Sequence, residues 1–133
     1  MTETADTTGA GVRTQSISYI IGWWILVSIT GLSILNHLSG PLVGFAEDDA
    51  EVFAFFSLAA LNIYALAVLL TAYRRGEQWA WSVTWATVGI HAMTMLYAPE
   101  AGRYYLGAAV VMAVAQLLTW SAFRLSRRVG LEG

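Results

Sequence analysis

Four stretches of about 20 mainly apolar residues, joined by short polar connections, dominate the pattern of the chain. A helix needs about 20 such residues to cross a bilayer, because each adds about 1.5 Å across an apolar core about 30 Å thick. No stretch has an acidic or basic residue in its interior, so each can enter lipid at little cost. The pattern predicts an all-α polytopic membrane protein whose four transmembrane helices cover residues of about 17–38, 52–73, 79–97 and 104–123.

Polar segments flank the predicted membrane domain, which covers residues 16–124. Residues 1–15 contain no apolar run and are expected to form a disordered cytoplasmic tail, and residues 125–133 are expected to form a cytoplasmic C-terminal tail. The first apolar run spans about 22 residues and lacks a strongly basic segment before it. We therefore expect it to stay in the protein as a helix rather than to be cleaved as a signal peptide.

The arginines set the expected orientation, because the cytoplasmic segments of membrane proteins retain positive charge. When the spans alternate in direction, six of the seven arginines fall on the side that holds both termini: Arg13, Arg74, Arg75, Arg124, Arg127 and Arg128. The opposite side has Arg103 and a set of acidic residues: Glu47, Asp48, Asp49, Glu51 and Glu100. We expect both termini to be cytoplasmic and the protein to lie in the inner (plasma) membrane.

Composition excludes several classes of protein. The chain is 57% hydrophobic and 12% charged, whereas soluble domains are roughly 25% charged. A soluble domain of 133 residues could not bury so much apolar surface, so the bilayer is the expected partner. The absence of cysteine excludes disulfides, thiol catalysis and cysteine-ligated metals. Nucleic acid is not an expected partner, because the few arginines flank apolar spans.

The two halves of the chain resemble each other. The segment Trp23–Pro41 aligns with Trp81–Pro99 at a constant shift, which pairs Gly31 with Gly89, and the second and fourth spans also correspond in pattern. Each half predicts a hairpin that starts on the cytoplasmic side, so we expect a four-helix bundle of two tandem hairpins. Apolar helices match each other readily, so duplication and chance similarity both stay open.

With Gly31 and Leu32 in the first span and Arg74 and Arg75 closing the second, the chain resembles small DoxX-like bacterial membrane proteins over its whole length. The resemblance lies in the hydropathy pattern and implies a four-helix bundle. It also implies an association with quinone-linked redox systems, as for some members of that family, while many members have no known activity. The resemblance assigns no role to individual residues.

Polar side chains inside apolar spans are where function is expected, because in lipid they cost free energy unless they find partners. Helical spacing predicts two polar stripes, each with one of the two histidines: Thr30, Ser33 and His37 in the first span, and Thr84, Thr87, His91 and Thr94 in the third. Asn62 and Gln116 lie near the middle of the other two spans, and Trp85 is a candidate for packing or for a pocket wall. Together these residues predict a cavity that is open to the outer side.

Three interpretations of these polar groups stay open. In the first, they only hold the helices together. In the second, they line a pocket for a lipophilic small molecule such as a quinone, with His91 and Asn62 as hydrogen-bonding groups. In the third, His37 and His91 ligate the iron of haem b from two helices, as in a redox membrane anchor. The candidate pocket residues are His91, His37, Asn62, Gln116, Thr87, Thr94, Ser33 and Trp85.

The expected function is that of an accessory protein or subunit in the membrane, with a small oligomeric transporter or channel as the alternative. Four helices bury little of their own surface, so a homo-oligomer or a larger membrane complex is expected. The acidic segment 47–51 predicts the start of a helix, because Asp48 and Asp49 stand where acidic caps stabilise one. A divalent-cation site is the alternative there.

Overall fold

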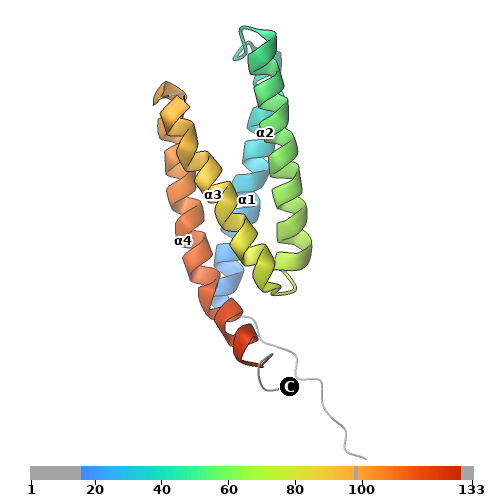
Figure 1. The fold of residues 1–133 in the computed structure, drawn as a ribbon, viewed down its shortest axis with the longest axis vertical. Coiled ribbons are helices and arrows are strands. Elements are labelled where there is room, and N and C mark those ends of the chain that lie inside the picture. The colour runs from blue at the N-terminus through green and yellow to red at the C-terminus, as the bar shows by residue number, and fades with distance from the viewer. Residues whose placement is uncertain (1–15, 98, 130–133) are drawn as a thin grey trace, which may run out of the picture.

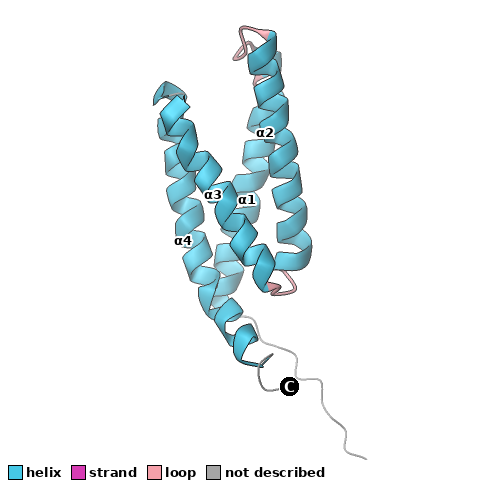
Figure 2. Cartoon of the chain, viewed as in Figure 1, coloured by secondary structure: helices cyan, strands magenta, loops and turns pink. Residues whose placement is uncertain are grey.

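The computed structural model describes residues 16–97 and 99–129, and these residues are helical apart from short connections (Figure 1, Figure 2). A 3₁₀ turn η1 (Pro41–Val43) follows the first helix, and a π-helical segment η2 (Leu69–Tyr73) continues the second. The described residues contain no strand. The predicted all-α class is therefore confirmed, with four helices: α1 (Ile17–Ser39), α2 (Asp49–Val68), α3 (Gln78–Tyr97) and α4 (Pro99–Val129).

Three helical segments in the described part of the chain are long and apolar enough to cross a membrane: Ile17–Ser39, Asp49–Tyr73 and Gly102–Phe123. They match the first, second and fourth predicted spans. Helix α3 has the predicted bounds to within one residue, but its serine, threonine and histidine side chains make it less apolar than these three segments.

Helix α4 is longer than its predicted span, because it starts at Pro99 and continues to Val129. It therefore takes in the first residues of the predicted C-terminal tail. At its C-terminal end the extra segment is residues 124–129. Arginine and leucine, which favour helices, occupy much of this segment, and it contains no glycine. The predicted tail 1–15 and residues 130–133 lie outside the described residues.

The helices pack in the order α2–α1–α4–α3. Helix α1 contacts both α2 and α4, and α3 packs mainly against α4, so both predicted hairpins are present. The contact between α1 and α4 has no equal between α2 and α3, which meet sparingly. The two halves therefore have the same topology. However, α1 and α4 form a contact that the equivalent helices, α3 and α2, do not form.

The two ends of the molecule differ in charge. The α2–α3 connection, with Arg74 and Arg75, lies at the same end as the start of α1 and the end of α4 (Figure 1). We call this the arginine end. The α1–α2 connection, with the acidic residues 47–51, lies at the opposite end together with the start of α4 (Figure 1). We call this the acidic end.

The acidic segment caps α2, as its sequence predicts. The Asp48 carboxylate accepts a hydrogen bond from the N–H of Glu51 (2.8 Å), and the Glu51 carboxylate accepts one from the N–H of Glu47 (2.7 Å). Such bonds satisfy backbone donors that a helix start leaves free. Among the residues described, no group of three or more histidine, cysteine or acidic side chains is arranged to hold a metal ion.

The α2–α3 connection is a tight turn built on Gly76, whose φ of 76° lies in the left-handed region that glycine favours. The following Glu77 accepts hydrogen bonds from Trp79 Nε1 (2.6 Å) and Arg75 Nε (2.7 Å). Both bonds lower the pKa of Glu77, and the bond from Trp79 has the larger effect.

The π segment η2 accepts hydrogen bonds from side chains of α1. A π turn widens the helix and exposes backbone carbonyls to other donors. The Trp23 indole donates to the carbonyl of Leu69 (2.9 Å), and the Tyr19 hydroxyl donates to that of Tyr73 (2.9 Å). Both donors come from α1, so the wide turn is held by the neighbouring helix.

Candidate functional site

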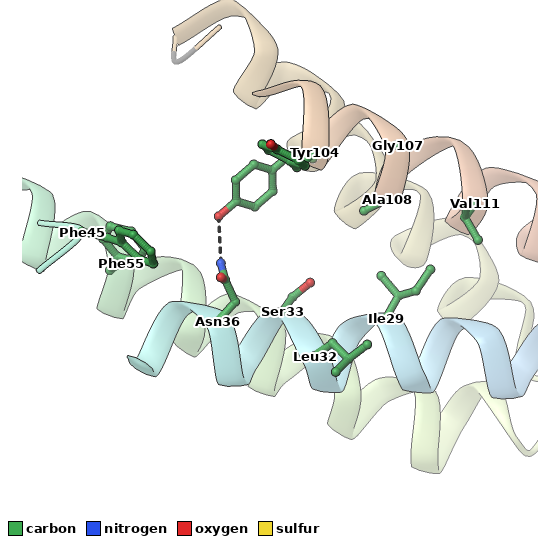
Figure 3. Close-up of a pocket in the computed structure, with 11 residues that line it drawn as sticks. Ile29, Leu32, Ser33, Asn36, Phe45, Phe55, Tyr104, Gly107, Ala108 and Val111 are labelled. Atoms are coloured by element: carbon green, nitrogen blue, oxygen red, sulfur yellow. Dashed lines mark hydrogen bonds between the residues drawn. The ribbon is translucent and has the colours of Figure 1, made fainter. Parts of the chain in front are cut away.

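A partly open pocket of about 680 Å³ lies between α1 and α4, toward the acidic end. Figure 3 shows side chains of α1 and α4 facing each other across it, with two phenylalanines at one side. Pockets of 300–1,000 Å³ are typical of sites for small molecules. The lining comes from α1 (Ile29, Leu32, Ser33, Asn36), the α1–α2 connection (Phe45), α2 (Phe55) and α4 (Tyr104, Tyr105, Gly107, Ala108, Val111).

Small residues on α4 keep this space open. Gly107 and Ala108 carry little or no side chain where α4 faces α1. A Cβ atom built on Gly107 would meet no atom within 4 Å, so even a larger side chain would find room there. At these two positions α4 therefore presents mainly backbone to the pocket.

A buried histidine, His37, contacts the lining residue Tyr105. His37 is 1% exposed, and its Nε2 lies 3.0 Å from the hydroxyl of Tyr105, whose ring stacks on the imidazole at 5.7 Å. The amide of Asn36 donates to the same hydroxyl at 3.3 Å, the bond drawn as a dashed line in Figure 3. On the other side of the imidazole, Nδ1 lies 3.4 Å from Nδ2 of Asn62.

The second histidine reaches the pocket through Ser33. His91 Nδ1 lies 2.9 Å from the carbonyl oxygen of Thr87, which can only accept, so Nδ1 of the neutral ring carries the hydrogen. Nε2 then accepts from the Ser33 hydroxyl at 3.4 Å. The His91 ring lies 6.0 Å from that of Tyr105, so both predicted polar stripes meet around one tyrosine.

The structure brings together His37, His91, Asn62, Ser33 and Thr87 and places the remaining predicted pocket residues elsewhere. Gln116 belongs to a closed cluster nearer the arginine end, where it accepts from the Tyr73 hydroxyl (2.5 Å) and donates to the carbonyl of Trp81 (3.0 Å). Trp85 packs against Trp81 at 5.8 Å. Thr94 donates to the carbonyl of Ile90 (3.1 Å). Of the eight predicted pocket residues, only Ser33 belongs to the lining, and the four residues grouped with it lie outside the lining as well.

Sequence reasoning missed Tyr105 as a pocket residue, because a tyrosine near the end of a span usually serves as an interface anchor. The position of Tyr105 around the helix could have indicated its burial. Tyr105 shares its face of α4 with Ala109, Met112 and Gln116 at spacings of four, three and four residues, and these three are buried. A tyrosine on the buried face of its helix points into the bundle.

The histidines do not fit the predicted alternative of haem b held between them. The Tyr105 ring stands against both imidazoles, and every ring nitrogen of His37 and His91 has a partner in the protein. An iron ligated by both rings would have to displace Tyr105 and open these bonds.

Comparison with known proteins adds no family to this description. The sequence matches no protein-family model, and neither a curated protein nor a solved structure matches it. The DoxX-like resemblance therefore stays a prediction from the sequence pattern.

Proposed function

We propose that this chain is an integral membrane accessory protein or subunit that binds a lipophilic small molecule, such as a quinone-like compound, in the pocket between α1 and α4. The observation that supports this most directly is the make-up of the pocket. Its lining is largely aliphatic and aromatic, with a few polar groups from Ser33 and Asn36 on α1 and Tyr105 on α4. Sites for small molecules usually combine an apolar lining with a few placed polar groups in this way.

We further propose that α3 is the fourth transmembrane helix, although it is less apolar than the others. Several of its polar groups bond to their own helix. The Thr84 hydroxyl donates to the carbonyl of Ala80 (2.8 Å), and the Thr94 hydroxyl and His91 Nδ1–H donate in the same i to i−4 pattern. A polar side chain satisfied within its helix costs less in lipid than its hydropathy value implies.

Four spans place both termini on the same side of the membrane, together with Arg74 and Arg75. By the positive-inside rule that side is cytoplasmic in an inner (plasma) membrane, so the pocket and the acidic end face outward.

The apolar surface supports the lipid environment and lateral entry of a ligand. Large apolar side chains are exposed along the helices, such as Leu32 (66%) on α1 and Leu117 (62%) on α4. Leu32 also belongs to the pocket rim, so a molecule dissolved in the bilayer reaches the pocket without crossing water. The same surface offers room for a second copy or a larger membrane complex.

Photolabelling tests the proposal. The protein is reconstituted in nanodiscs of ether-linked phosphatidylcholine with a long-chain ketone that carries a diazirine. We expect saturable labelling of peptides that contain Ile29 and Val111. Gly107→Leu should lower that labelling about tenfold, because the new side chain fills the pocket.

Gly89→Leu is the matched control. A Cβ on Gly89 also meets nothing within 4 Å, but Gly89 lies on the exposed side of α3 and does not line the pocket. This variant should label like the wild type. Labelling that does not saturate, or that is equal in the two leucine variants, would show that the pocket is not a binding site.

A further inference from the structure

We infer that the pocket selects a molecule with a flat unsaturated ring at one end and an aliphatic chain at the other, and that Gly40 positions Phe55 for this selection. This inference rests on the proposed function, because it names the chemical class and the orientation of the ligand that the same pocket binds. The two ends of the pocket differ in their lining, and each end suits a different part of such a molecule.

The lining changes from aromatic to aliphatic along the helices. Its aromatic side chains lie toward the acidic end, and we call this part of the pocket the aromatic end: Phe45, Phe55, Tyr104 and Tyr105. Val111 on α4 lies two helical turns after Tyr104, about 10 Å further toward the arginine end. Ile29 of α1 lies opposite Val111 (Figure 3), and we call these two residues the aliphatic end.

Two rings of the aromatic end are held by the buried imidazole of His37. The Tyr105 ring stacks on it with ring centroids 5.7 Å apart, and the Phe55 ring lies tilted against it at 6.1 Å. Aromatic rings attract each other at such distances. Phe55 and Tyr105 are half-buried, whereas Phe45 and Tyr104 are each 70% exposed. Phe55 and Tyr105 therefore give the pocket two rings whose positions are set by packing.

Gly40 sets the position of the Phe55 ring from another direction. A Cβ atom on Gly40 would collide with Cε1 of Phe55 and would lie 2.8 Å from Cδ1, so the ring rests directly on the glycine backbone.

The glycine is needed here for space and not for backbone conformation. Its φ of −49° suits other residues, and its N–H donates to the carbonyl of Asn36 (2.9 Å), a bond that alanine would keep. The atoms that a new Cβ meets belong to a side chain, which can turn away. Gly40→Ala therefore displaces the ring of Phe55 and leaves the end of α1 intact.

A flat unsaturated ring suits the aromatic end better than a saturated ring of the same size. The faces and edges of aromatic rings attract another π system beyond what the burial of area alone gives, and a saturated ring has no π system. The aliphatic end offers no such interaction, so it suits a chain. Leu32 is 66% exposed at the edge of the pocket, and the chain can continue past it into the bilayer.

The test compares two photoreactive probes in ether-lipid nanodiscs. Both have the same alkyl chain with a diazirine at its far end, and the chain is long enough to reach from the aromatic end to Ile29. One probe ends in naphthalene and the other in decalin, its saturated counterpart. We expect both to label Ile29 and Val111 saturably, and the naphthalene probe to reach half-maximal labelling at about fivefold lower concentration. A third probe, with the diazirine on the naphthalene ring, should label the aromatic end.

Two variants remove the fixed ring in different ways. Gly40→Ala displaces it and Phe55→Leu deletes it, so each should reduce the preference for naphthalene to about twofold or less. Gly31→Ala and Phe56→Leu are the matched controls and should keep the wild-type preference. A Cβ on Gly31 meets nothing within 4 Å, Phe56 is an exposed phenylalanine of α2, and neither residue lines the pocket.

Equal half-maximal concentrations for naphthalene and decalin in the wild type would overturn the inference while leaving the proposed function intact, and this comparison needs no variant to fold. Labelling of the aliphatic end by the ring-borne diazirine would contradict the orientation. A preference that persists in both Gly40→Ala and Phe55→Leu would show that these residues do not select the ring. The absence of saturable labelling by any of the three probes would instead overturn the proposed function.

Discussion

At the scale of single residues, two buried threonines differ in whether their hydroxyls have partners. Thr119 on α4 donates to the carbonyl of Gln116 (2.8 Å) and lies 2.5 Å from the hydroxyl of Tyr73. Thr30 on α1 is equally buried, yet its hydroxyl oxygen has no partner in the described part of the protein. A buried hydroxyl without a partner costs free energy, whereas a paired one does not.

We therefore expect Thr30→Val to raise the free energy of unfolding by about 1 kcal/mol, because it removes an unpaired hydroxyl at nearly constant volume. Thr119→Val should lower it by about 1 kcal/mol, because it removes a paired one. Unfolding in detergent micelles with increasing denaturant measures both values. A destabilised Thr30→Val would mean that this hydroxyl has a partner after all.

The sequence was informative about which polar residues are buried and uninformative about which of them bond to one another. The spacing of His37 and His91 on helical faces predicts that they point inward, and both are buried. Which side chains they contact depends on the depth at which α1 and α4 cross, and no local pattern encodes that depth. For this reason Tyr105, which touches both rings, was not predicted.

At the scale of elements, the crossing of α1 and α4 depends on one glycine. A Cβ on Gly22 would lie 2.6 Å from the carbonyl oxygen of Ala115 and 2.9 Å from Cγ2 of Thr119. Small residues at helix crossings allow such close approach in membrane proteins. The glycine pair of the internal repeat behaves differently, because a Cβ on Gly31 or Gly89 meets nothing within 4 Å.

Gly22→Leu should therefore destabilise the bundle by about 1–3 kcal/mol, since the added side chain must push α4 away from α1. Gly31→Leu on the same helix is the control and should change stability by less than about 0.5 kcal/mol. Thermal unfolding of the purified variants in one detergent compares them. Equal midpoints for the two variants would contradict the close crossing.

Helix boundaries follow from the sequence where capping residues mark them and fail where none does. Ser16 accepts from the N–H of Tyr19 at the start of α1, and Asp48 caps α2, so both starts lie close to the predicted ones. The end of α4 has no such marker before Gly130, and the helix runs past the predicted span to Val129.

At the scale of the whole molecule, the number of spans decides on which side the chain ends. Three helical segments meet the length and apolarity of a membrane span, and α3 is the fourth in our proposal. With three spans the termini would lie on opposite sides of the membrane. With four they lie on the same side, as the arginines favour.

Reporter fusions distinguish these two topologies. We expect a reporter that is active only outside the cytoplasm to work when inserted after Ala46, in the α1–α2 connection, and to fail after Gly76 and after Gly133. A cytoplasmic reporter at the same positions should give the reverse pattern. Activity of the outside reporter after Gly133 would show that α3 does not span.

The order α2–α1–α4–α3 illustrates what the internal repeat could and could not predict. Two matched hairpins predict the pairs α1–α2 and α3–α4, and both are present. Exact equivalence of the halves would also give α2 and α3 a contact like that of α1 with α4, yet α2 and α3 meet sparingly. How two hairpins dock depends on side chains from both, such as Gly22 on α1 facing Ala115 on α4, and a repeat within one chain does not specify it.

The distribution of indole rings has a practical consequence. None of the tryptophans lines the pocket, and they lie in the parts of α1, α3 and α4 nearer the arginine end: Trp23, Trp24, Trp79, Trp81, Trp85 and Trp120. Their ultraviolet emission therefore reports on the half of the bundle that does not contain the pocket. Tryptophan fluorescence can therefore monitor the folding of the bundle independently of the pocket. A fluorescent probe of the pocket has to be introduced at the other end of the bundle.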